Sequence, residues 1–189
     1  MTNPFRKLTH EEKIRERMRG FTRQAPPNPW RVVSHAVGGL TEIGYDRGTD
    51  LLLAVSESGR GLFDCRIGQR IARNSTAAAE GSWYQPIKLL AEGIDVIAKH
   101  TISLAGLHGG GLPLFAEDGW SLQPVAPDWP RAKIILCPSF RSALSEQHGG
   151  GCVCVGEDYE FRAYGFSETG LSFVIATSST LKIFTRSEG

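Results

Sequence analysis

The chain has 189 residues, of which 41% are hydrophobic and 22% are charged, and its formal net charge is +1. A chain of this length buries about two-thirds of its unfolded surface without disulfides or metals, so one domain is expected. The small net charge excludes a strong overall attraction to nucleic acid or to an anionic membrane, and no segment approaches the roughly 18 apolar residues of a membrane span.

Positive charge is concentrated at the start of the chain. The first 31 residues hold eight lysines and arginines against three acidic residues, and the remainder holds thirteen against seventeen. This start contains no apolar run of secretory length, so we expect a cytoplasmic location. In that compartment the four cysteines are expected to be reduced thiols: Cys65, Cys137, Cys152 and Cys154.

The segment "LTHEEKIRER" predicts a short helix. Thr9 can cap the first turn while Glu12, three residues later, reaches back to the cap, which is the capping-box pattern. The helix is expected to end near Arg19, with Ile14 and Met18 on one face because they are four residues apart.

The proline-rich "QAPPNPW" stops the helix, because proline lacks an amide donor and biases the preceding residue toward an extended conformation. We therefore expect a basic helical arm with a proline-rich linker over residues 1–29 and a single domain over residues 30–189.

The arm is a candidate interaction element, with Arg15, Arg17 and Arg19 as its binding residues. A helix this short with so narrow an apolar stripe is expected to be mobile, or to dock on an acidic surface of this chain, of a second copy or of another protein. No aromatic stacking platform accompanies the arginines, and glutamates intersperse them, so nucleic acid is not the expected partner.

Residues 30–189 are predicted to form strands, because short apolar runs alternate with Gly, Asp, Ser and Pro. Residues 74–93 are the exception, where a short helix and a surface excursion both remain open. Displacing the chain by 121 residues aligns "GYDRGTDLLLAVSESGRGLFD" (44–64) with "GFSETGLSFVIATSSTLKIFT" (165–185) without a gap, which predicts two equivalent hairpins.

Two weaker matches extend this pattern. Residues 111–125 parallel the same hairpin around a glycine turn, and residues 152–164 alternate like a further hairpin. The chain from residue 152 to residue 186 is thereby expected to form four successive antiparallel strands, the size of one propeller blade.

The segments "AYGFSETGLSFVIATSSTLKIFTR" and "EIGYDRGTDLLLAVSESGRGLFDCRIGQRIAR" resemble the central strands of tryptophan-aspartate-repeat and quinoprotein-like β-propeller blades. The resemblance covers about 60 residues, and the family's Gly-His and Trp-Asp signatures are absent, with Phe63-Asp64 approximating the second. It implies an all-β fold of antiparallel repeated hairpins, an incomplete or small propeller. A β-sandwich is the alternative, since residues 30–189 are few for a closed propeller.

The motif His-Gly-Gly-Gly occurs twice, at "LHGGGLP" and "QHGGGCVC". In lipase-like hydrolases such a loop supplies backbone amides to an oxyanion hole, which would assign His108, Gly109 and Gly110 to a small hydrolase. The Gly-x-Ser-x-Gly nucleophile turn of those enzymes is missing, however. Three consecutive glycines also suit a plain turn, so both motifs are expected to be loops.

A zinc-stabilised module is a second alternative, since His148, Cys152 and Cys154 have suitable ligand chemistry. A fourth ligand is absent nearby, and free cysteines usually pack as small hydrophobes, so no cofactor is expected. The stretch "DGWSLQPVAPDWP" places Trp120 and Trp129 where they could form a binding rim. Together these observations predict a non-catalytic binding or protein-interaction module.

Overall fold

The computed structural model describes residues 7–187 of the chain. Strands make up 45% of it and helices 9%, so the predicted all-β class with a short N-terminal helix is confirmed. The helix is α1 (His10–Gly20), and two 3-10 turns, η1 (Pro86–Lys88) and η2 (Asp95–Ile97), occur later. The strands are β1 (Arg31–Ala36), β2 (Leu40–Tyr45), β3 (Leu51–Ser56), β4 (Gly59–Asp64), β5 (Gln69–Asn74), β6 (Tyr84–Gln85), β7 (Leu90–Glu92), β8 (Thr101–Ser103), β9 (Ala105–Gly106), β10 (Ser121–Asp128), β11 (Arg131–Cys137), β12 (Val153–Asp158), β13 (Phe161–Phe166), β14 (Ser172–Thr177) and β15 (Thr180–Thr185).

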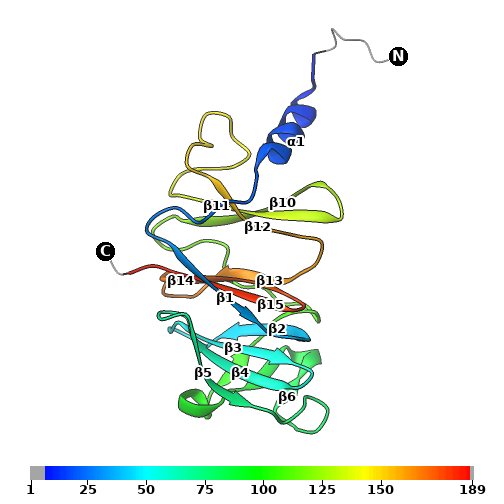
Figure 1. Ribbon diagram of the computed structural model, residues 1–189, viewed down its shortest axis with the longest axis vertical. Helices are drawn as coiled ribbons and strands as arrows, with labels where there is room; N and C mark the ends of the chain where they lie inside the picture. Colours follow the sequence, from blue (N-terminus) through cyan, green and yellow to red (C-terminus); the bar gives the residue numbers. More distant parts are fainter. Residues whose placement is uncertain (1–6, 188–189) are drawn as a thin grey trace.

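These strands form four antiparallel sheets, which we name in the order in which they are stacked. Sheet A is β10-β11-β12, sheet B is β1-β15-β14-β13, sheet C is β5-β4-β3-β2-β9 and sheet D is β6-β7-β8. Figure 1 shows the stack along the long axis of the molecule, with α1 beyond sheet A and sheet D at the far end. Each of the four described sheets is open and ends in an edge strand on both sides.

The core is divided among the interfaces of this stack. Met18 of α1 packs on sheet A, Phe173 of sheet B on Leu122 of sheet A, Val174 of sheet B on Leu52 of sheet C, and Leu53 of sheet C on Ile102 of sheet D. Sheets B and C are therefore covered on both faces. This explains why β3 and β14 read as continuous apolar runs rather than as alternating ones.

The segments matched at an offset of 121 residues have the same backbone pattern. Strands β2, β3 and β4 have the bounds of β13, β14 and β15 shifted by that offset, and both segments are antiparallel hairpins, as the match predicts. The pairing also corresponds: Leu52 faces Phe63 in sheet C as Phe173 faces Phe184 in sheet B. In both segments the pairing register shifts at the start of the first strand, between Leu40 and Glu42 in β2 and between Phe161 and Ala163 in β13.

The two weaker matches had different outcomes. Residues 114–122 form a short antiparallel hairpin around Gly119, in which the amide of Leu122 donates to the carbonyl of Leu114 and the amide of Ala116 donates to the carbonyl of Trp120, with one bridge from Phe115 to Ser121. Strand β12 pairs with β11 in sheet A, whereas β13 pairs with β14 in sheet B, so residues 152–186 do not form one four-stranded blade. The fourth strand of sheet B is instead β1, from near the start of the chain.

For residues 74–93 the sequence left a short helix and a surface excursion open. This segment forms turns, the short strand β6, the 3-10 turn η1 and the whole of β7, so it becomes part of sheet D rather than a helix. Trp83 is its main buried side chain and packs in the core between sheets C and D.

A buried carboxylate joins sheet C to sheet B. Asp50, in the turn before β3, accepts hydrogen bonds from Ser167 Oγ at 2.7 Å, Thr169 Oγ1 at 2.8 Å and Ser172 Oγ at 2.5 Å. The three hydroxyls belong to the β13–β14 turn and the start of β14, which is the matched turn of the other segment. The Asp50 network therefore fixes the two turns against each other.

The helix α1 begins as the sequence predicts. Thr9 Oγ1 accepts from the amide of Glu12, and the Glu12 carboxylate accepts from the amide of Thr9, which completes the capping box. At the other end, the ammonium of Lys133 donates to the carbonyls of Met18 and Phe21, so a cation neutralises the negative end of the helix dipole.

No helix among the described residues is long and apolar enough to cross a membrane.

Candidate functional site

The arginines predicted as binding residues on α1 do not form one surface. Arg19 forms an ion pair with Asp128 at the end of β10, and its Nε donates to Oδ1 of that carboxylate at 2.9 Å. The Arg17 guanidinium lies against Gly149, where a side chain would overlap it. Arg15 is exposed. The arm thus docks on sheet A of its own chain through Met18 and Arg19, one of the outcomes that its charge predicted.

The two tryptophans proposed as a rim lie at opposite ends of β10. Trp120 precedes the strand and is half-buried, with its ring edge-on to Trp30 at 5.8 Å between centroids. Trp129 follows the strand at the tip of the β10–β11 hairpin and is 83% exposed. The structure therefore does not bring them together.

The three candidate zinc ligands lie in different environments. Cys154 is buried beneath α1 in the cluster that contains Met18, and Cys152 packs against the same cluster, as the period of two along a strand predicts. His148 is exposed and bonds to Ser145. Within residues 7–187, no group of three or more His, Cys, Asp or Glu side chains is placed to hold a metal ion.

The first His-Gly-Gly-Gly loop is anchored by a buried carboxylate. Glu42 of β2 is fully buried, with His108 Nδ1 at 2.5 Å from its Oε1, and Tyr84 Oη donates to its Oε2 at 2.8 Å. Burial, together with the nearby Glu42, raises the pKa of Tyr84 far above its usual range. In the described part of the chain, no Ser, Thr or Cys side chain bonds to His108. This arrangement fixes the His108 loop against Glu42 and Tyr84.

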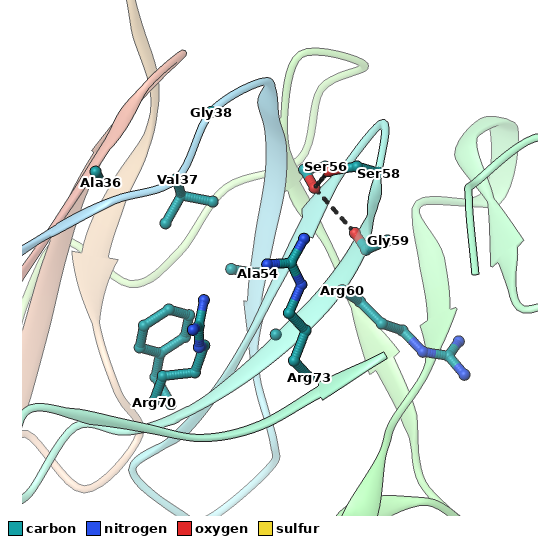
Figure 2. Close-up of a pocket in the computed structure, with 12 residues that line it drawn as sticks. Ala36, Val37, Gly38, Ala54, Ser56, Ser58, Gly59, Arg60, Arg70 and Arg73 are labelled. Carbon is teal, nitrogen blue, oxygen red and sulfur yellow. Dashed lines mark hydrogen bonds between the residues drawn. The ribbon is translucent and has the colours of Figure 1, made fainter. Parts of the chain in front are cut away.

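A cavity of about 240 Å³ lies between sheets B and C, near the outer edge of the stack. Its floor is Phe63 and Ala54 of sheet C, and its rim on the side of sheet B is the end of β1 and the residues after it, Ala36 to Gly38. Gly61 also lines the cavity, and a Cβ there would lie in ordinary van der Waals contact with the side chains of Arg70 and Phe63, at 3.4 Å. Figure 2 shows these residues around the cavity.

Two arginines of the edge strand β5 project into this cavity. Arg70 pairs with Phe63, and Arg73 pairs with Gly61. Residues three apart on a regular strand point to opposite faces, but a register shift between the Leu62 and Phe63 pairs inserts an extra residue in β5. Both guanidiniums therefore lie on the face of sheet C that points to sheet B, as Figure 2 shows.

The turn between β3 and β4 supplies the polar groups of the cavity. Ser56 and Ser58 both line it, and Ser56 Oγ donates to the carbonyl of Gly59 at 3.2 Å (Figure 2). Gly59 has a φ of +118°, in the region that strongly favours glycine, and a Cβ there would overlap the carbonyl of Asn74. The glycine thus allows the turn to lie close to β5.

Arg60 also borders the cavity, but its side chain leaves through the other face of sheet C. Figure 2 shows it pointing away from Arg70 and Arg73. Its guanidinium lies over the Trp83 ring, 4.3 Å from the centroid, and burial lowers the pKa of this group. Arg60 therefore contributes to the packing of sheet D rather than to the cavity.

Comparison with known proteins gives no relative. No protein-family model matches the chain, and no curated protein is significantly similar to it. The chemistry of the site must therefore be inferred from its own residues.

The cavity favours an anion. The guanidiniums of Arg70 and Arg73 form no ion pair or hydrogen bond within the described range 7–187; their backbones pair with β4. The lining residues include no Asp or Glu. Both arginines are exposed, and each guanidinium has a planar set of donors that matches a carboxylate or a phosphate.

Sequence reasoning missed this site. The segment "QRIARN" has two arginines and no acid, which is the available signal. The extra residue that turns both arginines to one face cannot be read from that pattern, because it depends on the partner strand.

Proposed function

We propose that this protein is a non-catalytic binding module, and that the cavity between sheets B and C binds an anionic group of a protein partner. The observation that carries the proposal is the pair formed by Arg70 and Arg73, which face a cavity without any carboxylate among its lining residues. A bound carboxylate would accept hydrogen bonds from these guanidiniums and would supply the negative charge that the lining lacks.

The composition of the cavity favours binding over catalysis. Its lining residues include no His, Lys, Cys, Tyr, Asp or Glu. General acid–base catalysis needs a group that exchanges a proton near neutral pH, and arginine does not. The hydroxyls of Ser56 and Ser58 therefore have no base within the lining that could activate them. We assign the Ser58 hydroxyl to hydrogen bonding with the anion, because the Ser56 hydroxyl donates to the carbonyl of Gly59.

The cellular location and the likeness to propeller blades are also part of this proposal. We place the protein in the cytoplasm, where its four free cysteines remain thiols. We also retain the likeness to propeller blades as a hypothesis, supported by the face-to-face stacking of four sheets and by the way β1 completes sheet B. The docked arm leaves Arg15 exposed for a second contact, whereas Arg19 is engaged by Asp128.

The test is a titration with a small anionic probe. N-acetyl diglutamate amide is added to the 15N-labelled protein, and the amide signals of residues 56–61 and 70–73 are followed by NMR. We expect shifts confined to these segments, and their loss in the double variant Arg70→Ala/Arg73→Ala. The double variant Lys88→Ala/Lys99→Ala is the matched control, because it removes two exposed cations from sheet D and its neighbourhood.

Absence of any shift at millimolar probe would contradict the proposal. Equal shifts in the wild type and in the Arg70→Ala/Arg73→Ala variant would place the anion elsewhere and would also contradict it. The control variant should respond as the wild type does, because simple loss of two positive charges does not remove a specific site.

A further inference from the structure

A second cavity, of about 390 Å³, lies one sheet further along the stack, between sheets A and B. Its cations are Arg23, from the segment after α1, and Lys182 of β15. The segment carrying Arg23 runs beside β12, where the amide of Gln24 donates to the carbonyl of Cys154 at 2.9 Å. No Asp or Glu is among the residues that line this cavity.

The two cavities occupy corresponding positions of the matched segments. Gly61 and Phe63 line the first, and Lys182 and Phe184, which are 121 residues later, line the second. The first lies in front of the face of sheet C that packs on sheet B, and the second in front of the face of sheet B that packs on sheet A. The offset that relates the strands thus also relates the cavities.

Their cations come from different elements, however. In the first cavity the charges are Arg70 and Arg73 of β5, the edge strand of sheet C. In the second cavity, Lys182 occupies the position that corresponds to Gly61. Burial and the nearby Arg23 lower the pKa of Lys182, and the negative charge of Asp158 acts in the opposite direction. Both cavities are therefore basic, although different side chains supply their positive charges.

Strand β1 connects the two cavities. Val32 and Ser34 line the second, and Ala36 lines the first. Stacked sheets lie about 10 Å apart, and a strand advances about 3.3 Å per residue, so neighbouring cavities are within reach of one extended segment of about four residues. The edge strands β1 and β5 have no acidic residue in their sequences RVVSHA and QRIARN.

We propose that the second cavity is also an anion site, and that the two cavities together bind one extended acidic peptide segment that lies across the outer edges of sheets C and B. This rests on the proposed function, since it assigns the partner of the first cavity. A peptide is favoured over nucleic acid because the exposed large apolar residues of β1 and β5 are aliphatic: Val32, Val33 and Ile71. Sequence-independent binding of single strands depends on exposed aromatic rings on which bases stack.

The test compares a long and a short acidic peptide. The long probe is N-acetyl decaglutamate amide, which spans about 33 Å when extended, and the short probe is N-acetyl diglutamate amide, which cannot reach both cavities. Binding is measured by isothermal titration calorimetry at about 50 mM salt, where charge attraction is weakly screened. The proteins are the wild type, Arg70→Ala/Arg73→Ala, Arg23→Ala/Lys182→Met and the control Lys88→Ala/Lys99→Ala.

We expect the long peptide to bind one protein chain, and to bind at least about 10-fold more weakly to either cavity variant, because each loses one half of a linked pair of contacts. The control should keep wild-type affinity. The short peptide should lose affinity with Arg70→Ala/Arg73→Ala. Circular dichroism and thermal melting of each variant check that it is folded.

The outcomes separate the two proposals. If Arg23→Ala/Lys182→Met binds the long peptide with wild-type affinity while Arg70→Ala/Arg73→Ala does not, the two-cavity inference is wrong and the proposed function stands. If neither cavity variant weakens either peptide, both are wrong. Tighter binding of the oligonucleotide dT10 than of decaglutamate, lost in the same two variants, would overturn the assignment to an acidic peptide.

Discussion

Replacement of Asp50 by alanine tests whether sheets B and C are held together by the buried network described above. The carboxylate accepts from Ser167, Thr169 and Ser172, and a hydrogen bond to a charged group contributes about 1.5–3 kcal/mol net. Three such bonds would sum to about 6 kcal/mol if the hydroxyls had no other partners.

They do have other partners, which lowers the expected loss. Ser167 Oγ lies 3.0 Å from Thr169 Oγ1 and also contacts the carbonyl of Ser172 at 3.2 Å, while Ser172 Oγ lies 3.1 Å from Tyr45 Oη. We therefore expect Asp50→Ala to lower the free energy of unfolding by about 3 kcal/mol, the cost of removing one member of a buried polar network.

Urea unfolding followed by tryptophan fluorescence and by circular dichroism measures this loss. Glu57→Ala, at an exposed position in the next turn, is the control and should change stability by less than about 0.5 kcal/mol. A loss under about 1 kcal/mol for Asp50→Ala would refute the reasoning, because the three bonds would then contribute no more than an ordinary neutral one.

Two further substitutions test the other buried contacts. His108→Ala should lower the free energy of unfolding by about 2 kcal/mol in the same urea assay, because the fully buried Glu42 loses one of its two partners. The side chain of His148, in the second glycine motif, is exposed and bonds to Ser145, so His148→Ala should cost less than about 0.5 kcal/mol. Equal losses for the two variants would contradict this. Met18→Ala should cost about 2 kcal/mol by thermal or urea unfolding, because the side chain is 3% exposed beneath α1, and an unchanged stability would show instead that the helix is a mobile tail.

Features of the fold could be predicted from the sequence where the residues that determine them are close together in the chain. The capping box at Thr9 and Glu12 fixed the start of α1, because both partners lie within one turn. The match between residues 44–64 and 165–185 identified two hairpins, because strand, turn and strand follow one another without a gap.

Pairing between distant strands could not be predicted in the same way. An apolar run shows that a strand is buried but not which strand lies beside it, so residues 152–158 were grouped with the hairpin that follows them, although they belong to sheet A. The cavity was missed for a related reason. The two arginines of β5 face one side only because of a register shift against β4, which is a property of the pair of strands.

The pairing of β1 with β15 has a consequence for the order in which the molecule can be assembled. All the strands of sheets C and D, from β2 to β9, are synthesised before sheet A begins, so these two sheets can form early. Strand β1 is made before any of them, yet its partner β15 follows every other described strand. Until β15 is made, β1 has no partner strand; afterwards it pairs on one side only and remains the edge of sheet B, with Val32 and Val33 exposed. Pairing with β15 thus closes one side of β1, and its other side stays open to contact with another chain.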